Sequence, residues 1–258
     1  MKKIINLISI IFLVTSFFIV SSCSRGKNKS DTNNNEEIVK DAEPFDFSNT
    51  SYMVFGDSIT YGADYSNGYK QMNTPYDVAV KNILNLKSTT NKGVSGATFT
   101  RNNLDLTCMS DLITSTTQHA DIISVMGGVN DFNRNLPLGN INDSTPTTIY
   151  GSLNVTMRYL KQQYPNSYIF YMTPYKENYS GILWSNNNTQ GYNLEDVANA
   201  IKEVALVHNI DVLDMFQYGE FENVMNNTNC DGIHPNQDFI LEKTAPQIAE
   251  FIKENYDK

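Results

Sequence analysis

The stretch DIISVMGGVND, residues 121–131, decides the fold class of this chain. Its first part, Asp121 to Met126, is almost continuously apolar and predicts a strand that is buried on both faces. Such strands are typical of parallel sheets whose two faces are covered by helices. The two glycines and the polar residues that follow, Gly127 to Asp131, predict a loop at the carboxyl end of this strand.

Short apolar runs of similar length lie on either side of this strand. Between them, longer segments carry apolar residues at the spacing of one helix face. Strands that alternate with helices predict βα repetition and a mostly parallel sheet covered on both faces. We therefore expect one α/β domain, residues 47–258, with a five-stranded sheet. The expected strands are 52–55, 89–94, 121–126, 168–172 and 210–214, and the expected helices are 75–86, 104–118, 147–163, 194–207 and 235–254.

The composition fits a folded domain and excludes several functional classes. The chain has 258 residues, of which 40% are hydrophobic and 18% are charged. Acidic residues outnumber basic ones, 28 against 19, and no basic run is present, so we expect no nucleic-acid partner. Three cysteines are too few for a disulfide scaffold.

The N-terminus has the pattern of an export signal. Two lysines precede a mostly apolar stretch, and Val20-Ser21-Ser22-Cys23 follows it. This tetrapeptide resembles a bacterial lipobox, which implies a signal peptide over 1–22, lipidation of Cys23 and an exported, membrane-anchored lipoprotein. A plain signal peptide or a membrane-spanning anchor is the alternative. The polar, Asn-rich residues 23–46 predict a flexible linker.

Polar and glycine-rich segments follow four of the predicted strands. In an open α/β sheet, ligands bind outside the carboxyl ends of the strands, so these segments are expected to meet at one edge. They are residues 56–60 (GDSIT), 93–96 (GVSG), 127–131 (GGVND) and 231–235 (DGIHP).

Only one histidine belongs to this edge. His119 and His208 precede strands and are therefore expected at the opposite edge, as surface or capping residues. His234 follows the last strand, and Asp231 lies three residues before it, so the carboxylate can accept from Nδ1 and leave Nε2 free as a base. Ser58, at the end of the first strand, is the natural nucleophile for such a base.

An acyl-transfer site also needs hydrogen-bond donors for the oxyanion. The candidates are the backbone N–H of Ser58, the backbone N–H of Gly96 and the side-chain amide of Asn130. We expect glycine at position 96 because a side chain there would hinder close approach. The neighbouring Asp131 is interpreted as a turn or capping residue.

Taken together, these motifs resemble those of the SGNH hydrolases of the GDSL type. Residues 56–59 match the first block with its nucleophile Ser58, residues 93–98 the second with Gly96, and residues 128–131 the third with Asn130. Residues 231–236 match the block that carries Asp231 and His234, and Ile59 is a common variant in the first block. The resemblance implies a flavodoxin-like three-layer α/β/α fold and a carboxylic ester hydrolase that needs no cofactor and no metal.

The predicted substrate rests on the segment that follows the fourth strand. Residues 174–193 contain five asparagines and four large aromatic residues, and their position puts them over the active edge. Aromatic rings can stack on sugar faces and amides can bond hydroxyls, which favours a small acyl group, such as acetyl, on a carbohydrate or another polar alcohol. The candidate binding residues are Tyr175, Tyr179, Trp184 and Tyr192.

Three other functions are alternatives to this one. The first is a lysophospholipase, which would act on a lipid ester. A thioesterase acting on acyl-CoA is disfavoured, because the protein is expected to be exported. A non-catalytic, glycan-binding surface lipoprotein would have lost Ser58 or His234, and both are present. A metal-dependent phosphoesterase lacks ligands, because the active edge offers one histidine.

Two cysteines remain beyond Cys23. Cys108 and Cys230 are both expected near the active edge, and disulfides persist in exported proteins. A Cys108–Cys230 disulfide would hold the loop that carries Asp231 and His234. Two buried thiols are the alternative.

Overall fold

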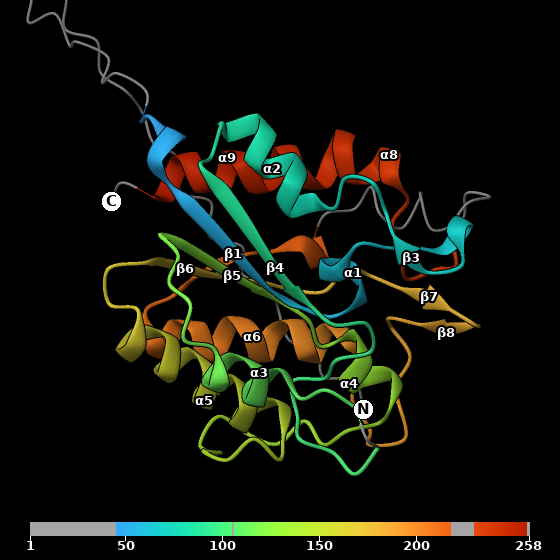
Figure 1. Cartoon of the computed structure of the whole chain (residues 1–258). Helices are drawn as coiled ribbons and strands as arrows, with labels where there is room; N and C mark the ends of the chain where they lie inside the picture. Colours follow the sequence, from blue (N-terminus) through green and yellow to red (C-terminus); the bar gives the residue numbers. More distant parts are fainter. Residues whose placement is uncertain (1–44, 105, 218–229, 257–258) are drawn as a thin grey trace, which may run out of the picture. The chain divides into compact units, whose positions relative to one another are not determined.

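Five parallel strands form the centre of the fold in the computed structural model (Figure 1). They are β1 (Ser51–Gly56), β4 (Ser88–Gly93), β5 (Ile122–Met126), β6 (Tyr168–Met172) and β9 (Asp211–Leu213), in the spatial order β4-β1-β5-β6-β9. All four neighbouring pairs are parallel. The expected α/β fold with a five-stranded sheet is therefore confirmed.

The central strands β1, β5 and β6 are largely apolar because both faces of the sheet are buried there. In β1, Tyr52 and Val54 pack into one core, whereas Met53 and Phe55 pack into the core on the other face. The same alternation continues along β5 and β6. The edge strand β4 is polar and only half-buried, which explains its weak sequence pattern.

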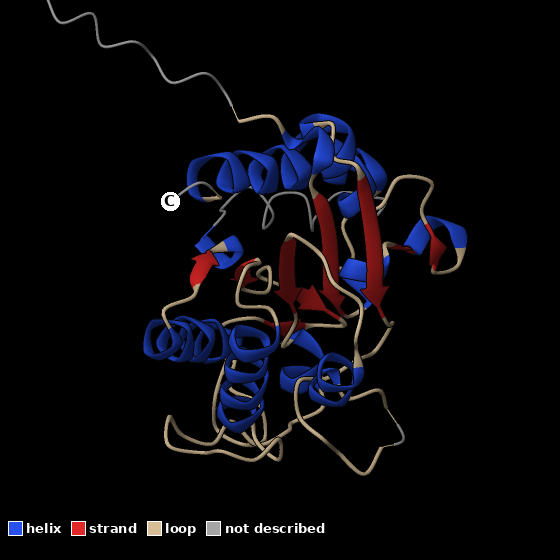
Figure 2. Ribbon diagram, turned by 60° about the vertical axis from the view of Figure 1, so that its left-hand side comes forward, coloured by secondary structure: helices blue, strands red, loops and turns tan. Residues whose placement is uncertain are grey.

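Helices form the two outer layers (Figure 2). One face of the sheet is covered by α2 (Tyr76–Leu84) and by the C-terminal helices α8 (Gln237–Phe239), η4 (Ile240–Thr244) and α9 (Ala245–Asn255). The other face is covered by α3 (Met109–Ser115), α5 (Ile149–Gln163) and α6 (Leu194–His208). Short helices α1 (Ser58–Tyr61) and α4 (Val129–Asn133) directly follow β1 and β5.

Two helices differ from their predicted extents. Helix α3 is much shorter than the predicted 104–118, because an extended bridge pairs Thr98 with Cys108 and uses the backbone groups that precede Met109. The predicted continuous helix 235–254 contains the π-helical turn η4 just before α9. Pro246 has no N–H for the carbonyl of Glu242, so a regular α-helix cannot continue through this position.

Two small hairpins lie beside the sheet and were not predicted. The first pairs β2 (Ala63–Asp64) with β3 (Lys70–Gln71) around the 3-10 helix η2 (Tyr65–Asn67), and the second pairs β7 (Asn178–Tyr179) with β8 (Ile182–Leu183). Two further 3-10 helices are η1 (Phe47–Asn49) and η3 (Met215–Gln217).

The structure describes residues 45–104, 106–217 and 230–256, which belong to one compact unit spanning residues 44–258. Within these ranges, every helix is too short or too polar to cross a membrane. The predicted signal peptide 1–22, the lipidation site Cys23 and nearly all of the linker 23–46 lie outside the described residues.

Candidate active site

Ser58 is positioned by the tight junction between β1 and α1. Asp57 caps this helix: its side chain accepts a hydrogen bond of 3.0 Å from the Ile59 N–H. Ser58 is the first residue of α1 and is 7% exposed, at the carboxyl edge of the sheet. Burial raises the pKa of the Asp57 carboxyl to about 6.

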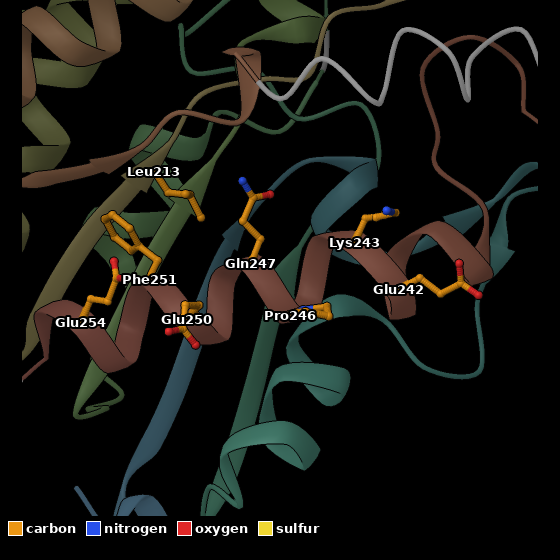
Figure 3. Close-up of a pocket in the computed structure, with 8 residues that line it drawn as sticks. All are labelled: Leu213, Glu242, Lys243, Pro246, Gln247, Glu250, Phe251 and Glu254. Carbon is orange, nitrogen blue, oxygen red and sulfur yellow. The ribbon is translucent and has the colours of Figure 1, made fainter. Parts of the chain in front are cut away.

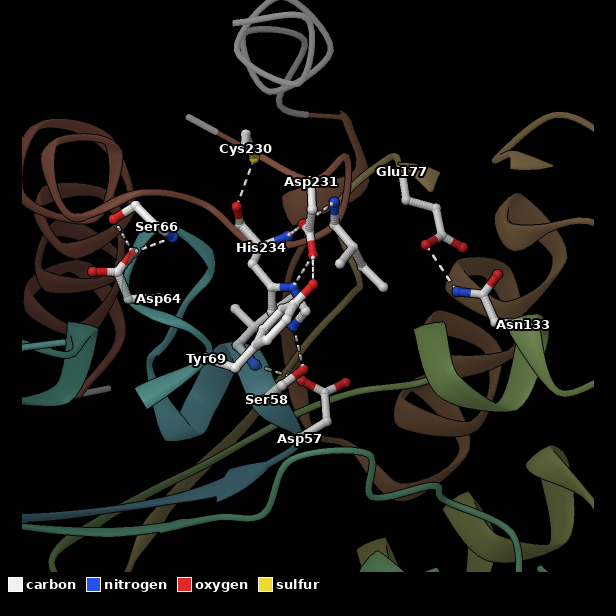
Figure 4. A network of polar contacts seen from close by, with 12 residues as sticks. Asp57, Ser58, Asp64, Ser66, Tyr69, Asn133, Glu177, Cys230, Asp231 and His234 are labelled. Carbon is white, nitrogen blue, oxygen red and sulfur yellow. Dashed lines mark hydrogen bonds and ion pairs between the residues drawn. The ribbon is translucent and has the colours of Figure 1, made fainter. Parts of the chain in front are cut away.

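The structure joins Ser58, His234 and Asp231 through two hydrogen bonds (Figure 4). His234 Nε2 lies 2.8 Å from Ser58 Oγ, and His234 Nδ1 lies 2.8 Å from Asp231 Oδ2. The other oxygen of Asp231 accepts from the backbone N–H groups of Ile233 and His234. Burial raises the pKa of Asp231, but its hydrogen bonds from His234 and Ile233 and the charge of His234 outweigh burial and lower the pKa overall.

The loop that carries Asp231 and His234 is supported by the β7–β8 hairpin. The Asn178 N–H donates to the Gly232 carbonyl over 2.9 Å. Gly232 has φ +93°, and a Cβ there would lie 2.1 Å from the Asn178 carbonyl oxygen. Glycine at this position therefore allows the hairpin to approach the loop closely.

Two further donors face the same place as Ser58. The side-chain amide of Asn130 donates one hydrogen to the Ala97 carbonyl over 3.1 Å, which leaves its second hydrogen for a ligand. Gly96 has φ +80°, and an added Cβ would meet only Arg134 Nη2, at 3.6 Å. The positive φ is thus a second reason for glycine at 96, and the expected close approach of a ligand to its backbone N–H stays a prediction.

One pocket brings these groups together. It has a volume of about 240 Å³ and opens onto Ser58, Gly96, Asn130 and His234. The remainder of its wall is formed by Ala63, Tyr69, Ser95, Asn133, Arg134, Tyr179 and Ile233. A serine hydroxyl, an imidazole and hydrogen-bond donors thus surround a single small space, and acyl transfer requires groups of these kinds in such an arrangement.

A sequence model of the GDSL-like Lipase/Acylhydrolase family matches residues 54–238. The chain belongs to the GDSL-like lipase/acylhydrolase family. It is accordingly a carboxylic ester hydrolase, and the resemblance noted in the sequence motifs is confirmed. No curated protein sequence matches the chain.

Solved structures of low sequence identity share the fold of this GDSL-like hydrolase. A "possible lipase" from Chitinophaga pinensis is 22% identical, with a TM-score of 0.63 over 80% of this chain and 98% of the other. A carbohydrate acetylesterase family member from Sinorhizobium meliloti is 14% identical, with a TM-score of 0.54 over 80% and 98%. The M. smegmatis aryl esterase is 15% identical, with a TM-score of 0.55 over 80% and 99%.

Asp131 is a buried residue that links two segments of the GDSL-like domain by hydrogen bonds, rather than a simple turn residue. Its carboxylate accepts hydrogen bonds from the backbone N–H groups of Phe99 and Thr100 and from the Thr100 hydroxyl. Burial raises its pKa to about 6. Asp131 therefore ties helix α4, which carries Asn130, to the segment that follows Gly96.

Two residues of the site were not predicted from the sequence. The Tyr69 hydroxyl donates to Asp231 Oδ2 over 3.1 Å, and its ring packs edge-on against the His234 ring. Arg134 Nη1 donates to Asn130 Oδ1 over 2.6 Å. Arg134 follows Asn130 by one helical turn and could have been found from that spacing, whereas Tyr69 lies in a loop with no motif.

A buried acid also lies near the site. Glu177 is 1% exposed, and its Oε2 accepts a hydrogen bond of 2.9 Å from the Asn133 side chain (Figure 4). Burial raises the pKa of Glu177 to about 8, and the charges of Asp57 and Asp231 act in the same direction. Glu177 Oε1 and Asn133 Oδ1 are both buried without a hydrogen-bond partner among the described residues.

The four aromatic residues proposed for substrate binding occupy different environments. Tyr179 lines the pocket and is 36% exposed. Tyr175 and Tyr192 are instead buried in the two cores, and their hydroxyls bond Thr244 and the Leu136 carbonyl respectively. Trp184 packs edge-on against Phe216 and carries Lys176 over its ring. The prediction for Tyr175 and Tyr192 is therefore corrected, because core packing occupies both rings.

The predicted Cys108–Cys230 disulfide is not formed in this structure. The buried Cys108 thiol donates to the Phe99 carbonyl, at the start of α3. The Cys230 thiol donates to the His234 carbonyl and packs against the core on the other face of the sheet. The sheet thus separates the surroundings of the two residues, and burial raises the pKa of both thiols.

A larger hollow of about 610 Å³ lies between β9 and the C-terminal helices (Figure 3). Its wall contains none of the predicted site residues and is formed by Leu213, Glu242, Lys243, Pro246, Gln247, Glu250, Phe251 and Glu254. In the described ranges, no group of three or more His, Cys, Asp or Glu side chains is arranged to hold a metal ion.

Proposed function

We propose that this protein is a serine esterase that uses Ser58 as nucleophile, His234 as base and Asp231 as the orienting acid. The observation that carries the proposal is the continuous hydrogen-bond chain from Ser58 Oγ through the His234 ring to Asp231. It ends in the pocket that also receives the Asn130 amide and the Gly96 backbone. A nucleophile and base within hydrogen-bond reach, with the base held by a third group, are the signature of an activated serine.

The reaction follows from these positions. Ser58 Oγ attacks the ester carbonyl carbon while His234 Nε2 takes its proton. The oxyanion accepts hydrogen bonds from Asn130 and from the backbone N–H groups of Gly96 and Ser58. When the tetrahedral intermediate collapses, the ester C–O bond breaks and His234 returns the proton to the leaving alcohol. Water then repeats the sequence on the acyl-enzyme, releasing the acid and restoring Ser58.

The proposed substrate is a short acyl ester, such as acetyl, of a carbohydrate or another polar alcohol. The pocket of about 240 Å³ is small, which limits the length of the acyl chain that it can hold, and polar groups interrupt its mostly apolar surface. A long acyl chain needs a broad apolar wall, and Ala63 and Ile233 are the only aliphatic side chains in the wall described here. Similarity of fold to a carbohydrate acetylesterase family member and to an aryl esterase is consistent with this class.

Rates on a matched pair of esters test the proposal. The wild-type protein should hydrolyse p-nitrophenyl acetate with a kcat/KM well above that for the decanoate, and acetylated oligosaccharides should be better substrates than lysophospholipid. S58A should lose at least about 10³-fold in kcat. Preference for the decanoate and lysophospholipid would make the protein a lipid esterase. Glycan binding without any turnover would make it a non-catalytic binding protein.

We also propose that Cys23 carries a lipid that anchors the exported protein to a membrane. The support is the sequence Val20-Ser21-Ser22-Cys23 after an apolar stretch. Cells fed a labelled fatty acid should incorporate label into the wild-type protein and not into C23A. Equal labelling of the two proteins would contradict the proposal.

A further inference from the structure

A second hollow lies beside the catalytic pocket and shares a wall with it. Its volume is about 380 Å³, and Asn133 lines both spaces. Helix α4 therefore presents Asn130 to the first space and ends at Asn133 between the two. The other residues around the second hollow are Phe132, Asn135, Gly181, Ile182, Asn186, Asn187, Asn188 and Thr189.

The wall of this hollow opposite α4 is the loop 186–189, which is held in place by hydrogen bonds. The Asn188 side chain donates to the Phe132 carbonyl over 3.1 Å, and the Asn135 side chain accepts from the Thr189 N–H over 2.7 Å. The Asn188 backbone N–H also donates to the Tyr192 carbonyl, and the Tyr192 ring is buried in the core. The loop 186–189 is thus fastened to α4 and to the core before any ligand arrives, which lowers the entropic cost of binding.

Two asparagines on this loop keep their hydrogen-bonding capacity. The side chains of Asn186 and Asn187 are exposed and make no hydrogen bond to another residue in the described ranges. An amide presents both a donor and an acceptor, as a hydroxyl group does. Phe132 and Ile182 add apolar surface to the same hollow. Apolar atoms form most of the surface of this hollow, and the amides lie at its margin. A sugar ring suits such a surface, because it has apolar faces and polar edges.

The absence of charged side chains among the described residues around the hollow disfavours charged ligands. No Lys, Arg, His, Asp or Glu lies among the residues that line it. A phosphate-bearing lipid head group or a charged sugar acid would lack a charged partner here. A neutral, polyhydroxylated group meets amides that can replace its hydrogen bonds to water.

We propose that the second hollow binds a neutral sugar unit adjacent to the acylated one. The enzyme would then prefer esters of oligosaccharides to esters of monosaccharides. The proposal rests on the proposed esterase function and extends it from the scissile ester to the neighbouring unit. Asn133 is the link, because the acylated unit and its neighbour would lie on its two sides. Asn186 and Asn187 would bond the hydroxyls of the neighbouring unit.

The test compares substrates of different length on a double variant, N186A/N187A. With wild-type enzyme, we expect a lower KM for an acetylated neutral tetrasaccharide than for the acetylated monosaccharide. The double variant should raise KM for the tetrasaccharide by about tenfold, because two hydrogen bonds are lost. Its kcat, and its kcat/KM on p-nitrophenyl acetate, should be unchanged. N199A, an exposed asparagine on α6, is the matched control and should change neither constant.

Two results would overturn the proposal: equal KM for the two sugar substrates in the wild type, or an unchanged tetrasaccharide KM in the double variant. Failure of the esterase proposal would look different, since p-nitrophenyl acetate would then be hydrolysed no faster by the wild type than by S58A. Inhibition by a sugar without an ester tests binding to the second hollow independently of turnover. The unacetylated tetrasaccharide should inhibit the wild type competitively and inhibit N186A/N187A about tenfold less strongly.

Discussion

Arg134 holds the Asn130 side chain in place, since Arg134 Nη1 donates to Asn130 Oδ1 over 2.6 Å. The Asn130 Nδ2 group donates in turn to the Ala97 carbonyl over 3.1 Å. The amide is therefore held at both its oxygen and its nitrogen, and one N–H remains for a ligand in the pocket that Asn130 lines together with Ser58. A donor that is oriented before substrate arrives needs no reorganisation as negative charge develops.

Removal of the donor itself should reduce the rate of the chemical step. N130A should lower kcat by roughly 10²–10³ with little change in KM, because the amide acts on charge that develops in the transition state. N130D should be worse, because a carboxylate would repel the oxyanion. Steady-state kinetics on p-nitrophenyl acetate measure both. A rise in KM with kcat unchanged would identify Asn130 as a substrate-binding residue instead.

Removal of the residue that orients Asn130 should have a smaller effect of the same kind. R134A should lower kcat by roughly tenfold, since the amide remains but loses one of its two anchors. The double variant R134A/N130A should be no slower than N130A alone, because Arg134 acts through Asn130. R158A, an exposed arginine on α5, is the control and should retain full activity. Additive losses in R134A/N130A would assign Arg134 a role independent of Asn130.

Tyr69 should contribute through both its hydroxyl and its ring. Y69F removes the hydrogen bond to Asp231 and keeps the ring against His234, so we expect a fall of about two- to fivefold in kcat/KM. Y69A removes both contacts and should be several-fold worse than Y69F. The comparison variant is Y65F, which alters an exposed tyrosine next to Tyr69 and should behave as wild type. Equal activity of Y69A and wild type would show that neither contact matters for turnover.

The buried Glu177 should make stability depend on pH. The native protein keeps the Glu177 proton up to about pH 8, whereas an unfolded chain loses it near the ordinary value of 4.5. Unfolding therefore releases a proton between these pH values, and the free energy of unfolding contributed by Glu177 falls as pH rises across this window. The whole window corresponds to at most about 5 kcal/mol.

The variant E177Q tests whether Glu177 causes this pH dependence of stability, because it replaces the protonated acid with an uncharged amide of the same shape. Its side chain can accept from Asn133 and donate to Asn133 Oδ1, which is otherwise buried without a partner. Urea unfolding at several pH values should show a smaller loss of stability between pH 5 and pH 8 than in wild type. E250Q, which changes an exposed glutamate on α9, should retain the wild-type slope. An unchanged slope in E177Q would show that Glu177 does not titrate in this window.

Much of the fold could be predicted because the decisive signals are local. The strands β5 and β6 are apolar runs with near-complete burial, and their predicted bounds agree with the structure to within one residue. The π-helical turn before α9 could also have been anticipated from Pro246. The hairpins β2–β3 and β7–β8 could not, because each strand has only two residues and carries no periodic pattern.

The candidate site was predictable where the topology determines position. Strand order alone brings the segments with Ser58, Gly96, Asn130 and His234 to one edge. The contact between Tyr69 and Asp231 joins residues far apart in sequence and depends on how a loop folds back. Similarly, a loop position suggested exposure for Tyr175 and Tyr192, but tertiary packing placed both rings in the core.

The proposed mechanism depends on Ser58 as the nucleophile, and labelling by a fluorophosphonate shows which serine is activated. We expect peptide mass spectrometry to find a single adduct on the wild-type protein, on Ser58, and none on S58A. H234A should be labelled at least about 10³-fold more slowly, because the Ser58 hydroxyl then lacks its base. An adduct on a different serine would contradict the assignment of Ser58 as nucleophile, and labelling of H234A at the wild-type rate would contradict the assignment of His234 as its base.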